Sequence, residues 1–528
     1  MKRILTATIT LLVACVACIS LSACSRGDVE GGVIYNGVWA VGCEDGVTEV
    51  TLRDGTVGIR SGAFSGRGDI TKITIPDSVT SVMHGAFDGC DGIISMSEGI
   101  RYVDGWAIDA SESITAAKLK EGTRGIADEA FYDCTEIVSI DMPSSVTSIG
   151  SRAFYGCNKV VSVSLPFIGA QRNGTLNNHF GYIFGASEPD QNANHVPQTL
   201  ESVTIIGDSE ICDEAFAGCK SIKRVQINGE IGEIGEGAFS DCTSLVEFKA
   251  SGSFKSIGDN AFIRCRALKS VTLPEGLEVI GQYAFAVCRS LEELRMPSTL
   301  KRIGMAAFGS CDSATVLTLP DGLEFIGQQA FDGCNALTSV TVPDCEMEIM
   351  VFFECVGLTE VTVSEGRESL PRRTFEGCTE LQRISLPASL TEICDSAFFG
   401  CTSLSDINLD EGITTIGNTA FAQCYSLEHI DLPESVEEIG SQAFYGADCV
   451  VKTAEGVSTV DGWIVGAPAS ITKMTLSTDT VGVASGAFAE CYGLTDVYYV
   501  GDETAFEKIK IGEDNAPLAD AQIHYTAS

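Results

Sequence analysis

The sequence is poor in proline, tryptophan and positive charge. Its 528 residues include 14 prolines, three tryptophans and 34 Lys or Arg against 72 Asp or Glu, and the formal net charge is −38. So few basic residues argue against non-specific binding to nucleic acid, because phosphate binding needs clustered Lys and Arg. A hydrophobic fraction of 45% excludes disorder. No Pro/Ser-rich linker divides the chain, although chains of this length normally split into several domains.

Long apolar runs are also lacking, except at the beginning of the chain. A basic start, Met1–Arg3, is followed by an apolar stretch from residue 4 to about residue 19 and then by Leu21-Ser22-Ala23-Cys24. A basic start, an apolar stretch and small residues before a cleavage point are typical of an export signal. Since no other run of about 18 apolar residues exists, no other segment is expected to span a membrane.

The four residues that end in Cys24 resemble a bacterial lipobox, in which the cysteine becomes the lipidated first residue. The resemblance predicts a lipoprotein signal peptide at 1–23, lipidation of Cys24 and a short tether at 24–31. The alternative is an ordinary signal peptide that happens to contain cysteines, because Cys15 and Cys18 also lie in this stretch. An acidic body on a lipid anchor would contact a membrane through the anchor only.

What the sequence has in abundance is a repeat. Phenylalanine, usually after alanine and followed three residues later by cysteine, recurs mostly at steps of 23 residues, and the step from Phe331 to Phe352 is two residues shorter. A fixed period of 20–29 residues with leucines at set offsets is typical of a leucine-rich solenoid. The sixteen anchors are Phe64, Phe87, Phe131, Phe154, Phe216, Phe239, Phe262, Phe285, Phe308, Phe331, Phe352, Phe375, Phe398, Phe421, Phe444 and Phe488.

One clean unit, Cys265 to Cys288, shows how a coil is built. Val271 and Leu273 are expected to alternate inward on a strand, and Gly281 to allow a backbone bend. Tyr283-Ala284-Phe285 is expected to close the coil through a short helical or 3₁₀ turn. Stacked units share a core, with parallel strands about 4.8 Å apart, so sixteen coils form a rod or arc on the order of 80 Å long.

The predicted fold class is therefore a β-rich leucine-rich-repeat solenoid, a single elongated domain of parallel strands and short turns over residues 32–500. The C-terminal residues 501–528 depart from the repeat and are expected to form a terminal cap, which solenoids need.

The tryptophans mark a variant unit. Trp39, Trp106 and Trp463 each lie 25 residues before a phenylalanine anchor, and the last two follow Val-Asp-Gly. This spacing predicts a hairpin-like coil in which the indole packs into the core. The alternative is a platform on which sugars stack.

A 62-residue step from Phe154 to Phe216 contains a 39-residue insertion that covers roughly 167–197. Its polar part, Ser187 to Pro197, is expected to be a surface loop, and long loops are often functional. The apolar side chains that would pin the loop to the solenoid are Phe180, Tyr182, Ile183 and Phe184. Within the insertion, His179, Asp190 and His195 are the one combination that could in principle bind a metal, but no metal or cofactor is expected.

The recurrent Ile-Gly-x-x-Ala-Phe-x-x-Cys-x-x-Leu-x-x-Val-x-Leu-Pro, seen in the unit from Ile280 to Pro297, resembles the BspA-like leucine-rich repeat family of bacterial surface proteins. The resemblance covers nearly all of residues 32–528. It implies a cell-surface adhesin or ligand-binding protein. The family has no known common active site, so no ligand residue carries over.

Fourteen cysteines follow an anchor by three residues and should form a ladder of buried thiols that behave as small hydrophobes. Disulfides between rungs are disfavoured because parallel side chains have the wrong geometry, and converging CxxC-type zinc ligands are absent after the signal segment. Cys212 and Cys394 occupy the slot of the repeat glycine. The ladder is Cys90, Cys134, Cys157, Cys219, Cys242, Cys265, Cys288, Cys311, Cys334, Cys355, Cys378, Cys401, Cys424 and Cys491.

On each strand, the residues before and after the buried position point outward, and along the rod they form two columns. The stretches of these columns whose residues are most distinctive form the candidate ligand-binding face. Our hypothesis is that this face binds a protein ligand through an extended polar surface. No arrangement of nucleophile and base points to catalysis, and the tripeptide Arg-Gly-Asp at Arg26–Asp28 and Arg67–Asp69 is too short to identify a partner. The candidate face consists of Arg224, Glu247, Lys249, Glu293, Arg295, Arg383, Asp406, Asn408, His429 and Asp431.

Three functions remain open at this point. The favoured one is an exported protein, lipid-anchored at the bacterial cell surface or envelope, that binds a host-matrix or other cell-surface protein, or a surface glycan. The second is a structural scaffold of the envelope. The third is an enzyme whose site lies in the insertion at 167–197.

Overall fold

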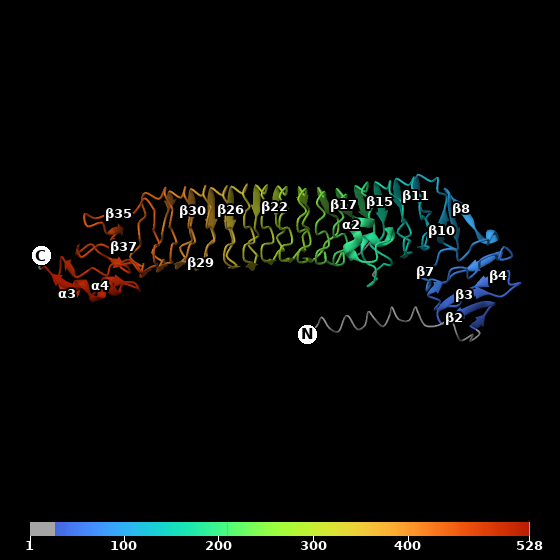
Figure 1. Ribbon diagram of the computed structural model, residues 1–528, viewed down its shortest axis with the longest axis horizontal. Coiled ribbons are helices and arrows are strands. Elements are labelled where there is room, and N and C mark those ends of the chain that lie inside the picture. Colours follow the sequence, from blue (N-terminus) through green and yellow to red (C-terminus); the bar gives the residue numbers. More distant parts are fainter. Residues whose placement is uncertain (1–26, 173, 208–209, 527–528) are drawn as a thin grey trace.

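The computed structural model describes residues 27–172, 174–207 and 210–526. The predicted signal peptide and Cys24 lie outside the described residues. The predicted solenoid is confirmed: the chain forms a single elongated leucine-rich-repeat domain of about 21 turns with a spacing of about 23 residues. Figure 1 shows a rod that is nearly straight through its middle and bends at its N-terminal end.

Most coils have a strand of two to four residues on one side of the rod, and these parallel strands form a ladder that we call row A. Figure 1 shows much of row A along the upper edge. Its strands are β4 (Glu49–Thr51), β6 (Lys72–Thr74), β11 (Ala116–Lys118), β13 (Ser139–Asp141), β15 (Ser162–Leu165), β16 (Ser202–Ile205), β17 (Arg224–Ile227), β18 (Glu247–Ala250), β20 (Ser270–Val271), β22 (Glu293–Arg295), β24 (Val316–Thr318), β26 (Ser339–Val342), β28 (Glu360–Val363), β30 (Arg383–Ser385), β32 (Asp406–Ile407), β38 (Lys473–Leu476), β40 (Asp496–Tyr499) and β42 (Gln522–Tyr525).

A second ladder of two-residue strands, row B, lies on another side of the coils. It consists of β5 (Gly58–Ile59), β7 (Ser81–Val82), β12 (Gly125–Ile126), β14 (Ser148–Ile149), β19 (Ser256–Ile257), β21 (Val279–Ile280), β23 (Arg302–Ile303), β25 (Phe325–Ile326), β27 (Glu346–Met347), β29 (Ser369–Leu370), β31 (Glu392–Ile393), β33 (Thr415–Ile416), β34 (Glu438–Ile439), β39 (Gly482–Val483) and β41 (Lys510–Ile511).

The alternating strand pattern holds in row A. In β17, Val225 and Ile227 are buried whereas Arg224 and Gln226 are exposed. Val271 packs against the core as expected, but it is only partly buried. Row A is interrupted at this point, because β20 is the last strand of a seven-stranded sheet and β22 begins another.

The third side of each coil differs from the helical or 3₁₀ turn that the sequence predicts. Ala286 and Cys288 donate to carbonyls three residues earlier, but Tyr283 and Val287 have left-handed φ angles of 54° and 62°. The reason lies in the neighbouring coil: the N–H groups of Tyr283, Phe285 and Val287 donate to the next coil at 2.7–2.8 Å. Every second N–H group in this segment therefore donates to the next coil. In a continuous helix the same N–H groups would donate to carbonyls of their own helix and could not join the coils.

The repeat glycine also has a different role from the expected one. Gly281 does not adopt a left-handed φ, but a Cβ atom there would lie 2.7 Å from the backbone N of Asp259 and the carbonyl C of Gly258. The glycine is needed because successive coils approach one another closely, and not because the backbone bends.

The anchors form a stack of aromatic rings. From Phe216 to Phe444, successive ring centroids are 5.0–5.7 Å apart and the planes differ by 3–13°. Rings in such offset stacks add stabilisation beyond the area that they bury.

The cysteine ladder lies beside the ring stack and has a role that the sequence did not reveal. All 19 described cysteines are free, and eleven ladder thiols donate to the carbonyl of the anchor phenylalanine in the preceding coil, with Sγ–O distances of 2.8–3.4 Å. Burial raises the pKa of thiols such as Cys242, to about 12, so they remain protonated donors.

The tryptophan units are antiparallel hairpins, as the spacing predicted. They are β2 (Val33–Asn36) with β3 (Trp39–Cys43), β9 (Ile100–Val103) with β10 (Trp106–Ala110), and β36 (Ser458–Val460) with β37 (Trp463–Gly466). Trp106 and Trp463 are buried as predicted, whereas Trp39 is only partly buried. Each of the three indoles lies on a glycine of the next coil, where a Cβ atom would come within 2.3–2.5 Å of the ring.

Three further strands border these hairpins: β1 (Asp28–Glu30), β8 (Ser95–Ser97) and β35 (Val451–Lys452). Because β1 pairs with β2, the fold begins within the segment expected to be a tether, four residues before the predicted boundary at residue 32. The helical elements are short: η2 (Asp91–Ile93), η3 (Phe180–Phe184), η4 (Pro189–Gln191), α2 (Asn192–His195), α3 (Glu503–Phe506) and α4 (Ala516–Asp520).

The coil that lacks two residues is compensated by its neighbour. Arg367 occupies the slot that holds Leu390 in the next unit, and only 6% of it is exposed. Its Nη2 donates to the carbonyls of Pro343 at 3.2 Å and of Cys345 at 2.6 Å, both in the turn of the shortened coil. The guanidinium therefore provides hydrogen-bond donors to two carbonyls of the shortened coil, one buried and one partly buried.

Replacing Arg367 should consequently destabilise the rod. Arg367→Ala removes both hydrogen bonds made by Nη2 and leaves a cavity, and we expect a loss of about 2–4 kcal/mol in the free energy of unfolding, measured by denaturant titration. Arg372→Ala, which removes an exposed ion pair with Asp395, should cost less than about 1 kcal/mol. Equal effects of the two variants would contradict the compensation.

The thiol ladder can be tested at one rung. Cys288→Ala removes the donor to the Phe262 carbonyl, which is 3.2 Å away, and should lower the free energy of unfolding by about 1–2 kcal/mol. Thr272→Ala, an exposed change on the same coil, is the matched control. A cysteine-to-alanine variant as stable as the control would show that the Sγ–H···O contact contributes nothing.

Candidate functional site

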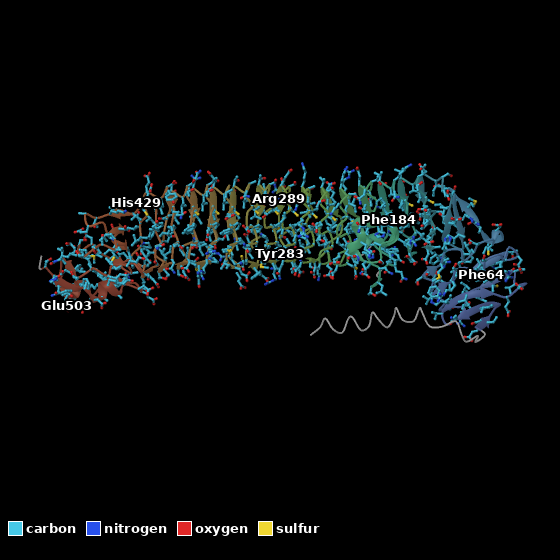
Figure 2. The ribbon with its side chains drawn as sticks, in the orientation of Figure 1. Phe64, Phe184, Tyr283, Arg289, His429 and Glu503 are labelled. Atoms are coloured by element: carbon cyan, nitrogen blue, oxygen red, sulfur yellow. The ribbon has the colours of Figure 1, made fainter. Side chains whose placement is uncertain are left out.

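Register in row A brings the predicted face residues side by side. Arg224 lies opposite Glu247, Glu247 opposite Ser270, and Arg383 opposite Asp406. Asn408, His429 and Asp431 belong to the same columns of the repeat but lie outside assigned strands. Figure 2 shows Arg289 and His429 along the upper edge of the rod and Tyr283 along the lower one.

The candidate face carries charge of both signs, paired within the face. Lys249 lies 2.6 Å from Glu247, Arg295 lies 2.8 Å from Glu293, and His429 lies 2.9 Å from Asp431. The hydrogen bond from Arg295 lowers the pKa of Glu293. These pairs are exposed, so they add little to stability and remain available to a partner.

The face is flat rather than concave. The middle of the rod, from β15 to β30, shows little curvature in Figure 1. A flat ribbon of regularly spaced polar side chains suits an extended protein surface better than a small molecule, which normally needs a concave pocket.

Row B contains a groove that the sequence reading missed. Its lining residues come from five successive coils and include Val279, Arg302, Phe325, Gly281 and Gly304, and its volume is about 480 Å³. The Arg302 guanidinium stacks on the Phe325 ring, with its central carbon 4.2 Å from the ring centroid. The sequence feature that could have indicated this groove is the presence of Val279 and Phe325 in a column of the repeat whose other members are mostly small or polar.

The insertion is tied to the core as predicted. Phe180, Ile183 and Phe184 are buried, and the Phe180 ring lies 4.9 Å from Phe216. The N–H of Phe154 donates to the Ile183 carbonyl at 2.8 Å, where an ordinary coil would offer its own carbonyl. The η3 turn therefore takes the place of a rung on the third side of the stack.

The polar part of the insertion is more ordered than the expected surface loop, because it contains η4 and α2. Asn192 is fully buried and links the insertion to the next coil: its Oδ1 accepts from the N–H of Gly181 at 2.9 Å, and its Nδ2 donates to the Ala215 carbonyl at 3.3 Å. His179 is also buried, and its Nδ1 lies 3.0 Å from Asn192 Oδ1.

The insertion does not assemble the metal-binding combination that the sequence left open. His195 Nδ1 lies 3.1 Å from the carbonyl of Gln191, the residue that precedes its helix α2. Across the described ranges, no three His, Cys, Asp or Glu residues are grouped so that they could hold a metal ion.

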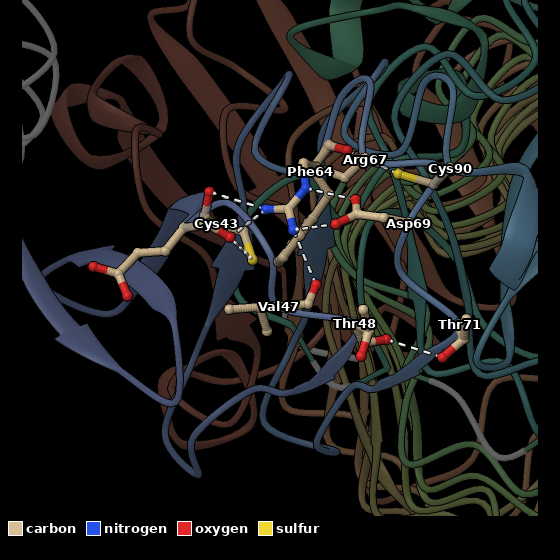
Figure 3. Close-up of polar contacts among 9 residues, drawn as sticks. Cys43, Val47, Thr48, Phe64, Arg67, Asp69, Thr71 and Cys90 are labelled. Carbon is tan, nitrogen blue, oxygen red and sulfur yellow. Dashed lines mark hydrogen bonds and ion pairs between the residues drawn. The ribbon is translucent and has the colours of Figure 1, made fainter.

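Arg67 of the second Arg-Gly-Asp tripeptide is engaged in a structural contact. Its guanidinium binds Asp69 through Nε at 2.8 Å and reaches the carbonyls of Cys43 at 3.2 Å and Val47 at 2.9 Å, as Figure 3 shows. The tripeptide thus fastens the first hairpin to the next coil, and its side chains are not presented as a loop tip.

The parallel ladders, the Phe-Cys stack and the repeat length together define a leucine-rich-repeat solenoid. The family model described as "BspA type Leucine rich repeat region", in six copies, matches residues 47–172, 197–315, 278–352 and 346–463. These segments cover most of the chain, which therefore belongs to the BspA-type leucine-rich repeat proteins.

Two solved structures of bacterial leucine-rich repeat proteins are similar to this chain. A leucine-rich repeat protein from Bacteroides ovatus is similar over 96% of this chain and 100% of its own, with 22% identity and a TM-score of 0.45. A leucine-rich cell surface protein from Faecalibacterium prausnitzii is similar over 79% of this chain and 97% of its own, with 18% identity and a TM-score of 0.31. Similarity at these values identifies no ligand.

No curated protein matches the chain. Among the residues that the structure describes, none of the helices has the length and apolar character needed to cross a membrane.

The buried histidine of the insertion should make stability depend on pH. Burial lowers the pKa of His179 below its ordinary value near 6.5, so the unfolded chain takes up a proton at a higher pH than the folded one. The stability that comes from burying His179 in its neutral form is therefore fully present above pH of about 6.5. It is lost as the pH falls toward the lower pKa of the folded state.

We therefore expect the wild-type melting temperature to fall more steeply between pH of about 7.5 and 5.5 than that of His179→Asn, whose amide can still donate to Asn192. His429→Asn, at an exposed site, is the matched control and should retain the wild-type slope. Parallel slopes for all three proteins would contradict the role of His179.

Proposed function

We propose that this chain is an exported, lipid-anchored binding protein of the bacterial cell surface, which holds a protein ligand on the outward face of row A and performs no catalysis. The observation that carries the proposal is the contrast between inward and outward positions. Inward positions repeat from coil to coil, whereas the outward columns change identity at almost every rung while remaining in register.

A protein ligand is supported by the shape and chemistry of this face. It is long, flat, exposed and polar, with donors and acceptors at the regular spacing of stacked strands. Because the coils are held rigidly by their neighbours, the side chains are positioned before binding, and little ordering entropy opposes association. The cell-surface location and the anchor at Cys24 rest on the lipobox resemblance and on the family.

The proposal is tested by screening the chain against purified matrix and cell-surface proteins and measuring the dissociation constant for each binder. Two clusters on the face are then changed to alanine: Arg224, Lys249 and Arg295 in one variant, and Arg383, Asp406 and His429 in the other. At least one cluster should weaken binding by about 10-fold or more, since a few residues usually dominate an interface.

The matched control changes Glu346, Glu392 and Glu438 of row B to alanine, which should alter affinity by less than about 2-fold. If both face clusters leave binding intact, row A is not the binding face. If the row B control variant loses binding instead, the ligand binds on the side of the rod that contains the groove.

A further inference from the structure

Positive charge is concentrated on one part of row A. We define the strand arc of a coil as the ten residues from the second position after the anchor to the end of the strand segment. The four arcs 218–227, 241–250, 264–273 and 287–296 together contain nine Lys or Arg and four Asp or Glu. The next six arcs, from 310–319 to 423–432, together contain one Arg and seven Asp or Glu.

The rest of the same four coils does not share this excess. Between residues 216 and 302 there are 12 basic and ten acidic residues in total, so the remaining sides hold three basic and six acidic residues. The positive patch therefore lies on the row A side alone, in a protein whose net charge is −38. We call these four arcs the basic patch.

Most cations of the basic patch are already paired, but three are not. Lys249, Arg264 and Arg295, for example, contact carboxylates at 2.6–2.8 Å. Lys220, Arg224 and Arg266 are exposed, and no carboxylate lies within ion-pair distance of any of them in the described ranges 27–172, 174–207 and 210–526. The pKa of Asp241 is lowered chiefly by its hydrogen bond from Arg264 and further by the charges of Lys220 and Arg266. That of Glu201 is lowered chiefly by Lys223 and further by Arg224. None of the three cations is itself held in an ion pair, so each can still contact a charge on a partner.

We propose that the basic patch is the docking surface for an acidic patch of a partner protein, with Lys220, Arg224 and Arg266 as its principal charge contacts. This inference rests on the proposed function, because it names the chemistry of the partner that row A would hold. Lys220 and Arg266 lie in one column two coils apart, about 10 Å along the rod, and Arg224 projects from β17. The partner's carboxylates must match that spacing.

The composition of the patch favours a protein over a uniformly anionic polymer. Glu247 and Glu293 lie among the cations and would repel a chain that carries negative charge at every unit. Thr243, Ser270 and Thr272 offer hydroxyl groups that suit the mixed polar surface of a folded protein. The acidic arcs on the C-terminal side repel an acidic partner, and this repulsion confines docking to the patch.

The test uses a soluble 20-residue peptide probe with Glu at every third position among Ser and Gly. Successive Glu residues then lie about 10 Å apart in an extended chain, which matches the spacing of Lys220 and Arg266. The triple variant Lys220→Glu, Arg224→Glu and Arg266→Glu should weaken binding of this peptide by about 10-fold or more. The control triple Lys72→Glu, Lys118→Glu and Lys452→Glu changes the net charge equally at exposed sites elsewhere and should weaken binding by less than about 2-fold.

Three outcomes would overturn the inference. One is an equal loss in both triple variants, which would mean that only net charge matters. Another is failure of the acidic peptide to bind better than the same peptide with Lys in place of Glu. The third is selective binding of a sulfated polysaccharide, and not of the acidic peptide, to the wild-type patch, which would assign the patch to a glycan.

The same variants separate this inference from the proposed function. If a protein ligand found by screening is lost on alanine substitution of the face clusters but is unaffected by the charge-reversal triple, row A binds a protein whose contacts are not acidic. In that case the partner chemistry is wrong while the binding function stands. If the ligand is insensitive to every row A variant, both fail.

Discussion

The fold depends on one constraint: on the third side of each coil, alternate N–H groups must find their acceptors in the next coil. Tyr283, Phe285 and Val287 donate onward at 2.7–2.8 Å, and the left-handed backbone at Tyr283 and Val287 makes this possible. Such backbone costs on the order of 1–3 kcal/mol per residue in isolation, so a single coil would not hold it. The repeated contacts set the close spacing at which phenylalanine rings stack and cysteine thiols reach the preceding phenylalanine carbonyl.

The irregular parts of the rod meet the same constraint with other atoms. At the C-terminal end, Asn515 Oδ1 accepts from the N–H of Phe488 at 2.9 Å, in place of the carbonyl that a further ordinary coil would supply. Asn192 joins the insertion to its neighbour in a comparable way, and Arg367 satisfies the carbonyls beside the two-residue deletion. Side chains thus stand in for backbone wherever the repeat is broken, because buried donors and acceptors must be paired.

Sequence periodicity was sufficient to predict the solenoid, the hairpin units around Trp39, Trp106 and Trp463, and the pinning of the insertion by Phe180. These features follow from apolar spacing, which acts within a single coil. The onward hydrogen bonds, the role of Gly281 and the thiol contacts of the cysteines were not predicted, because they depend on the distance between coils. The face residues could be placed in columns from their spacing alone, but the unpaired state of Lys220, Arg224 and Arg266 depends on where each neighbouring carboxylate lies.

The division between inward and outward positions also limits where a function can be encoded. Inward side chains are fixed by stacking, since each one touches the coils before and after it, and a change there affects both interfaces. Outward side chains of row A touch solvent and their column neighbours, so they can vary without cost to the stack. The excess of Lys and Arg in four arcs of an otherwise acidic rod is a property of these unconstrained positions. Packing and backbone pairing do not require it, and the repulsion among like charges opposes it, which makes recognition of an opposite charge the physical reason that remains.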